Sequence, residues 1–151
     1  MYQIIELKNM NVEEAAALCM QEYMEESKSI RNMPPIDGER EDAFAGTIEW
    51  VKTLPYGKAL LYEEKLVGFV AFVGPIEGLH GVAKGAFSPL GASAFAGKDR
   101  RKTVTLLLEA VGAELIRDEV YSIAMSRYTG NKEVNEALCL TASVSDVLTL
   151  F

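Results

Sequence analysis

The sequence has little of the chemistry on which metal sites and disulfide frameworks depend. Its 151 residues include two cysteines and one histidine. Cys19 and Cys139 lie far apart in helical patterns and form no CxxC motif, so they predict buried core positions rather than a disulfide. With no cluster of ligands, we expect no metal cofactor. Two unpaired cysteines favour a reducing compartment, and we expect a cytoplasmic protein.

A long apolar segment is also lacking, and so is an excess of positive charge. Leu66 to Val73 is apolar but far shorter than the ~20 residues that span a bilayer. The first residues have neither the basic start nor the apolar stretch of a secretory signal. Lysine and arginine number 15 against 22 acidic residues, which gives a net charge of −7. This charge argues against a nucleic-acid partner and against binding to an anionic membrane.

The hydrophobic patterning that is present predicts one α+β (α/β) domain over residues 1–151, without an internal repeat or a linker. Asn11 is a candidate helix cap, with Glu14 three residues later. Gly74 and Pro75 are expected to end a strand, and residues 91–98 have no periodicity. The expected elements are strands at 3–7, 59–62, 66–73, 81–87, 120–125 and 147–151, and helices at 11–26, 41–53, 101–117 and 131–140.

The clearest functional feature is a basic loop that leads into the helix at 101–117. From Lys98 to Lys102, four residues are positive and one, Asp99, is negative. A helix start already carries partial positive charge, so cations there are locally unfavourable. A bound anion would remove this conflict, because free N–H groups, the helix dipole and the cations would all face it. The alternative is a solvated basic turn. No GxxxxGK[ST], GxGxxG or GxSxG motif is present.

Around this loop the sequence resembles the acyl-CoA-binding segment of the GNAT N-acetyltransferases. The likeness is to a divergent bacterial branch with a GxxR-type loop, and the order of elements agrees over essentially the whole chain. It implies a central mixed sheet that is splayed near the strand before the loop and flanked by about four helices. The residues that carry the likeness are Ser88-Pro89-Leu90-Gly91, then Gly97-Lys98-Asp99-Arg100-Arg101, then a leucine-rich helix.

The resemblance further implies acetyl-CoA as the cosubstrate, with its pantetheine in the splay and its pyrophosphate on the loop. The implied reaction is transfer of the acetyl group to a primary amine of a small molecule or a protein. The implied cofactor-binding residues are Gly97, Lys98, Asp99, Arg100, Arg101 and Lys102, together with Asn131 and Asn135 beside the cofactor arm.

Acetyl transfer requires a base that deprotonates the amine and an acid that protonates the departing thiolate. Glu77 and His80 follow the strand at 66–73, beside the implied cleft, and either is a candidate base. Tyr128 follows the strand at 120–125 and is the candidate acid. Each of the three residues also has a structural interpretation. Glu77 would then be a loop carboxylate, His80 a loop histidine and Tyr128 a packing tyrosine at the end of a strand.

Departures from the family pattern keep other interpretations open. The Q/R-x-x-G-x-G/A motif is absent, because Arg101 and Thr103 stand where glycines usually do, and the last helix has no tyrosine. The alternative is a non-catalytic GNAT-like module that binds CoA, or only a partner domain, within a longer protein. A homodimer and a second GNAT-like domain are the protein partners left open. A phosphate-binding domain of another α/β type is a third interpretation.

Overall fold

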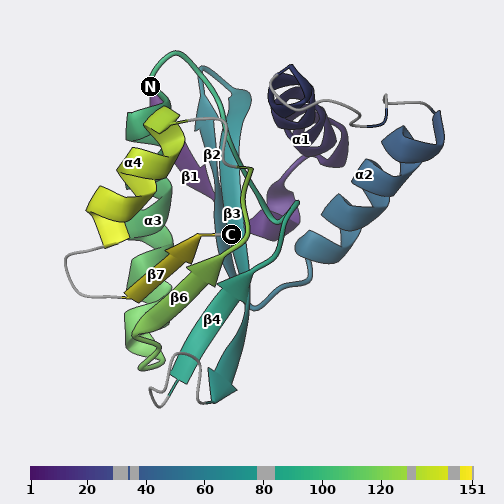
Figure 1. Ribbon diagram of the computed structural model, residues 1–151. Helices are drawn as coiled ribbons and strands as arrows, with labels where there is room; N and C mark the ends of the chain where they lie inside the picture. The colour runs from purple at the N-terminus through teal and green to yellow at the C-terminus, as the bar shows by residue number, and fades with distance from the viewer. Residues whose placement is uncertain (29–33, 35–37, 78–83, 129–131, 143–146, 151) are drawn as a thin grey trace.

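The computed structural model describes residues 1–28, 34, 38–77, 84–128, 132–142 and 147–150. Within them the chain forms one mixed β-sheet with helices on both faces (Figure 1), as predicted for the α+β class. The helices are α1 (Val12–Ser27), α2 (Gly38–Val51), α3 (Arg100–Arg117) and α4 (Lys132–Ala142), with a short 3-10 helix at Leu7–Asn9. The strands are β1 (Tyr2–Ile5), β2 (Tyr56–Tyr62), β3 (Lys65–Glu77), β4 (Lys84–Ser88), β5 (Ser93–Phe95), β6 (Ser122–Met125) and β7 (Val147–Leu150).

The strand order places a short strand outside the main sequence of pairings. Neighbouring strands follow the order β1-β2-β3-β4-β6-β7, and β5 pairs with β3 off this path. The pairings among β1, β2, β3, β4 and β5 are antiparallel. The pairings of β4 with β6 and of β6 with β7 are parallel. Two parallel strands need a crossover connection between them. For β4 and β6 that connection contains α3, which lies between β5 and β6 in the chain.

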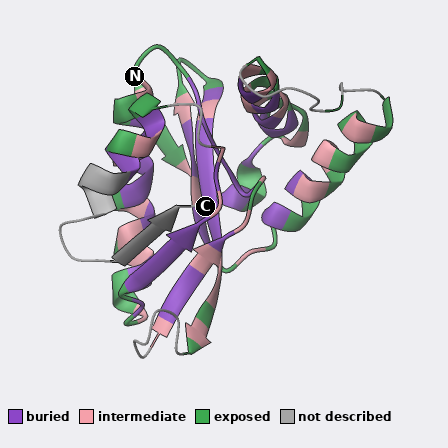
Figure 2. Ribbon diagram, in the orientation of Figure 1, coloured by how far each residue is buried: buried purple, intermediate pink, exposed green. Residues whose placement is uncertain are grey.

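Two helical layers cover the sheet, with α3 and α4 on one face and α1 and α2 on the other (Figure 1). Figure 2 shows that most of the strand length between them is buried. On one face, Ile48 and Val51 of α2 pack with Phe69 of β3. On the other, α3 contributes the apolar stripe predicted from its spacing, which is fully in the core: Val104, Leu107, Leu108, Val111 and Leu115.

The start of α1 follows its sequence signal. The side chain of Asn11 accepts a hydrogen bond from the N–H of Glu14 at 2.9 Å, which confirms the predicted cap. Cys19, about two turns into the helix, is buried, as its pattern indicates. The cap and the buried face together fix which side of α1 lies against the sheet.

Leu7, predicted in the first strand, instead begins the 3-10 helix, and two segments of the central sheet also differ from the sequence expectations. The prediction that Gly74 and Pro75 end the strand is wrong, because β3 continues to Glu77. The register of β3 on β4 shifts between Val73 and Ile76, and this irregularity accommodates a proline that has no N–H to donate.

The second difference is β5, which forms inside the stretch that has no periodicity. All three of its residues are buried, so packing rather than alternation makes it a strand. Gly68 of β3 makes the close packing around it attainable. A Cβ at Gly68 would lie 2.6 Å from the Thr103 Cγ2 and 3.0 Å from the Ala94 carbonyl oxygen.

The sheet splays at the point where β4 gives way to β5. β4 stays paired with β6 as far as Ser88 and Met125, and the Ser126 N–H then donates to the Ser88 carbonyl at 2.8 Å. After a turn in which Gly91 has a φ of +94°, β5 continues along β3 alone. The edge of β5 that faces away from β3 therefore has no strand beside it in the described residues. The predicted splay is present at this place.

Candidate functional site

The open edge of β5 is the centre of the candidate site. The main-chain groups of Ala92 and Ala96 bond to β3, through the Ala92 carbonyl to the Ala71 N–H at 2.9 Å and the Ala96 N–H to the Val67 carbonyl at 2.7 Å. Main-chain groups alternate between the two edges of a strand. The carbonyl of Ser93 and the N–H of Phe95 consequently point away from β3, into the splay.

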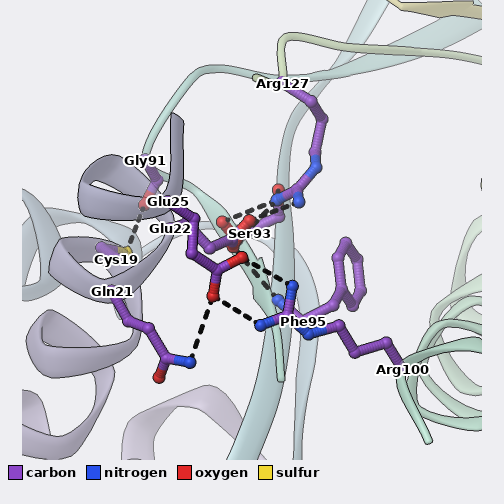
Figure 3. Close-up of polar contacts among 9 residues, drawn as sticks. All are labelled: Cys19, Gln21, Glu22, Glu25, Gly91, Ser93, Phe95, Arg100 and Arg127. Carbon is purple, nitrogen blue, oxygen red and sulfur yellow. Dashed lines mark hydrogen bonds and ion pairs between the residues drawn. The ribbon is translucent and has the colours of Figure 1, made fainter. Parts of the chain in front are cut away.

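Two charged side chains occupy these groups (Figure 3). The carboxylate of Glu22, from α1, accepts the Phe95 N–H at 3.2 Å. The guanidinium of Arg127, which follows β6, donates to the Ser93 carbonyl and to the Ser93 Oγ, each at 3.1 Å. Glu22 and Arg127 also bond to each other through both carboxylate oxygens. A side-chain pair thus takes the place that a neighbouring strand would have.

This pair is buried and imperfectly satisfied. The side chains of Arg127 and Glu22 are 4% and 10% exposed. The Arg127 guanidinium also lies over the Phe95 ring, 4.8 Å from its centroid. Its Nε has no hydrogen-bond partner in the part of the chain that is described. Charges taken out of water at this depth depend on each other, because either one alone would be buried without a counter-charge.

A small pocket opens beside the pair, where α1 and α2 meet the ends of β4 and β6. Its cavity volume is about 20 Å³. Cys19 donates its thiol to the Gly91 carbonyl at 3.8 Å, and burial raises the thiol pKa to about 12, so the sulfur is an inert thiol at neutral pH. The lining residues are Cys19, Glu22, Phe44, Leu90, Gly91, Ser93, Arg127 and Tyr128.

Tyr128, the predicted acid, lies in this pocket. Its ring meets Tyr23 edge to face, with the ring centroids 6.3 Å apart. Burial, helped by nearby groups that become negative when ionised, raises the pKa of its hydroxyl to about 12. The hydroxyl is therefore protonated over the whole physiological range and is available as a hydrogen-bond donor.

The start of α3 carries its own acidic cap. The Asp99 carboxylate accepts the Lys102 N–H at 3.1 Å, and the Thr103 hydroxyl donates to the Ala96 carbonyl at the same distance. Gly97, just before the cap, has a φ of +90°, a conformation that favours glycine. The carboxylate of Asp99 thus satisfies one of the N–H groups that the sequence analysis assigned to a bound anion.

The arginines of the basic loop are also engaged. Arg100 holds Glu25 of α1 with two hydrogen bonds, at 2.9 and 2.6 Å, and this guanidinium lowers the pKa of the Glu25 carboxyl. Arg101 bonds to Glu136 of α4 at 2.8 Å. Both arginines therefore point to neighbouring helices.

The two lysines of the loop are in a different position. Lys102 lies over the Tyr2 ring, 5.8 Å from the ring centroid. Lys98 is exposed and has no ion pair in the described ranges. Of the four cations, the lysines are the ones that an incoming anion could reach without breaking a salt bridge.

The remaining predicted residues are scattered or lie outside the described residues. Glu77 is exposed at the end of β3, opposite Lys84 at the start of β4, whereas Tyr128 lies beyond the other end of β4. The structure therefore does not bring Glu77 and Tyr128 together. Asn135 is half-buried in α4. His80 and Asn131 lie outside the described residues.

Sequence reasoning missed the residues that hold the open edge. Glu22 and Arg127 are separated by 105 positions, so their pairing has no local signal. A weaker signal did exist in each segment. Glu22 stands three residues after Cys19, next to the buried side of α1, and Arg127 is the second residue after a buried strand. A charge next to a buried element predicts a buried partner.

Two features are absent from the described residues. No helix there is both long enough and apolar enough to cross a membrane. The same residues contain no group of three or more histidine, cysteine or acidic side chains arranged to hold a metal ion.

Comparisons with known proteins identify similar folds, but they do not assign the chain to a family. A scan against protein-family models and a search of curated proteins both find no match. Among solved structures, the chain is similar to a variant of TTHA1254 from Thermus thermophilus, with 15% identity and a TM-score of 0.55 over 92% of this chain and 86% of that one. It is also similar to a conserved protein of unknown function from Enterococcus faecalis, described as a probable N-acyltransferase.

That second likeness has 17% identity and a TM-score of 0.51, and it covers 80% of this chain but 28% of the Enterococcus protein. At such identities the similarity concerns the fold. Together with the splayed mixed sheet and the four helices of the described residues, it confirms the fold predicted from the sequence. The chain has a GNAT-like α+β fold.

Proposed function

We propose that this chain is an acyl-CoA-dependent N-acyltransferase that transfers an acetyl group from acetyl-CoA to a primary amine. The observation that carries the proposal is the splay, in which the open edge of β5 lies between the start of α3 and the pocket that contains Tyr128. The fold likeness to a probable N-acyltransferase supports it. The amine would approach from the pocket side, between α1 and α2.

The residues around the splay fit acetyl-CoA in part. The Ser93 carbonyl and the Phe95 N–H could pair with the amides of a pantetheine arm, but Arg127 and Glu22 bond to them here. Exposed Lys98 and the Gly97 turn could face the pyrophosphate, while Asp99 caps α3. The cofactor therefore fits once the side chains on the β5 edge move aside. When bound, it would supply a thioester that an amine can attack.

Tyr128 is the residue that we propose for the transfer step. A hydroxyl with a pKa of about 12 is a weak acid toward a thiolate, because an effective proton donor has a pKa near the working pH. It remains a good hydrogen-bond donor to the thioester oxygen, where negative charge develops in the transition state. We therefore propose that Tyr128 stabilises charge rather than delivering the proton.

The experiment has two measurements, the melting temperature with acetyl-CoA in large excess and the release of free CoA with a panel of primary amines. An enzyme should show both a raised melting temperature and CoA release. Tyr128→Phe should lower kcat by about 10²-fold or more with little change in the thermal shift, since it removes one transition-state donor. The matched control is Tyr121→Phe, an exposed tyrosine before β6. Absence of both signals in the unaltered protein would reject the proposal.

The second candidate function is a non-catalytic module that binds CoA or a partner domain. The observation that favours it is the occupied edge of β5, together with the pairing of Arg100 and Arg101 to other helices. A thermal shift without CoA release would support a CoA-binding module. Binding of a second copy or of a second GNAT-like domain, without any shift, would support an interaction module. A cytoplasmic location is part of either proposal.

A further inference from the structure

Two groups of β5 that face the splay, the Ser93 carbonyl and the Phe95 N–H, bond to side chains that can rotate away. Glu22 and Arg127 each make one contact with a main-chain group of this edge, at 3.2 and 3.1 Å. A neighbouring strand would be held by its whole backbone, whereas these contacts depend on a few side-chain torsions. This edge can therefore open by movement of side chains, without separating any strand of the sheet from its neighbour.

We propose that Glu22 and Arg127 form an autoinhibitory clasp on the open edge of β5, which an acyl-CoA must displace in order to bind. The inference rests on the proposed function. In the clasped state the guanidinium lies across the splay between the end of β6 and Ser93, so an extended ligand cannot lie along the edge. In the open state the Ser93 carbonyl and the Phe95 N–H become available to the amides of the ligand.

When the clasp opens, the hydrogen bonds that the β5 edge loses can be replaced by bonds to the ligand. A pantetheine arm offers amide N–H and C=O groups, so each main-chain group of the edge exchanges one hydrogen bond for another. Glu22 and Arg127 contact each other through both carboxylate oxygens, so they can leave the edge as a pair without separating their charges. The Arg127 Nε has no partner in the described residues of the clasped state and can gain one in the pocket or in water.

The clasp makes a quantitative prediction about affinity. If a fraction of molecules is open, the apparent dissociation constant for acetyl-CoA equals the intrinsic constant divided by that fraction. Removing the clasp should therefore tighten binding, even though it deletes contacts from the protein. If the pair of Glu22 and Arg127 had only a structural role, its removal would destabilise the fold and leave the affinity for acetyl-CoA unchanged.

The test compares the unaltered protein with Glu22→Leu/Arg127→Met, in which neither side chain can bond to the β5 edge. The double variant replaces both charges together, so that neither is left buried alone and the chain can fold. Acetyl-CoA and CoA affinities are measured by calorimetry, and exchange of the Phe95 amide proton by NMR. We expect binding to tighten by about tenfold or more and the Phe95 amide to exchange faster. The control is Glu6→Gln/Lys58→Met, which removes an ion pair between β2 and the residue that follows β1, away from β5.

The outcomes separate the clasp from the proposed function. Tighter binding in the double variant, with no change in the control, supports the clasp, whether or not an amine is then acylated. Equal or weaker binding by the double variant overturns the clasp and leaves the proposed function to the CoA-release measurement. If neither protein binds acetyl-CoA, although the Phe95 amide of the folded double variant exchanges faster, both the clasp and the proposed function fail.

Discussion

The two edges of β5 are closed in different ways. One edge pairs with the main chain of β3, over Gly68, Phe69 and Val70. The other is closed by the side chains of Glu22 and Arg127, which come from opposite parts of the chain. The Ser93 carbonyl and the Phe95 N–H on the splay edge also have hydrogen-bond partners, as buried backbone groups need. They differ in what a ligand could replace, because only the side-chain edge can open without breaking the sheet.

The comparison shows why the two edges tolerate different changes. The β3 edge depends on close approach and has no spare volume, so added atoms should destabilise it. The splay edge depends on charge balance, so loss of one partner should destabilise it more than loss of both. Stability measurements on single and double variants can therefore distinguish the two kinds of closure.

The largest expected effect is that of removing one charge from the splay edge. Arg127→Met should lower the free energy of unfolding by about 3–5 kcal/mol, because it leaves the Glu22 carboxylate buried without a counter-charge. Urea unfolding measures the loss. Glu22→Leu/Arg127→Met should lose clearly less, since no lone charge remains. A single variant as stable as the double would mean that the two charges do not depend on each other.

A smaller effect is expected at the β3 edge. Gly68→Ala should cost about 1–3 kcal/mol, because the new methyl group meets Thr103 and the Ala94 carbonyl at closer than contact distance. Gly112→Ala in α3 is the matched control, since nothing lies within 4 Å of a Cβ there. That control should stabilise the protein by about 0.5–1 kcal/mol. Equal behaviour of the two variants in thermal unfolding would contradict the packing described for β5.

The smallest effect belongs to the neighbouring pair of Glu25 and Arg100, which does not touch β5. Its side chains are 35% and 16% exposed, so Glu25→Gln should cost at most about 1 kcal/mol at pH 7. The folded-state pKa of Glu25 is lowered, so this contribution is present above the unfolded pKa of about 4.3 and is lost as the pH falls through the folded value. The stability difference between the two proteins should therefore shrink from pH 7 to about pH 3. A stability difference that grows as the pH falls would contradict a lowered pKa for Glu25 in the folded protein.

Local signals were enough to predict most elements of the fold. The cap at Asn11 and the stripe from Val104 to Leu115 depend on residues a few positions apart, and both are found as expected. β5 could not be predicted in this way, because its strand character comes from burial beneath α1 and beside β3. The continuation of β3 past Pro75 likewise depends on a register shift against β4.

The candidate site was less accessible to sequence reasoning than the fold. The sequence predicts that the cations of the basic loop face a bound anion, whereas Arg100 and Arg101 have acidic partners on α1 and α4. Those partners lie 75 and 35 positions away in the sequence. The sequence places Tyr128 after the strand at 120–125, and in the structure its side chain lines the pocket. The carboxylate and guanidinium on the β5 edge required the tertiary structure.

The spacing of Glu22 and Glu25 on α1 has a consequence for ligand binding. The two carboxylates stand about one helical turn apart and reach separate partners, Arg127 after β6 and Arg100 at the start of α3. A rigid-body shift of α1 would carry Glu22, with Arg127, away from the β5 edge and Glu25 away from Arg100 in one movement, so the energetic cost of the second release is shared with the first. Occupation of one end of the splay should thus favour occupation of the other, and positive cooperativity between ligand fragments follows from the geometry of a single helix.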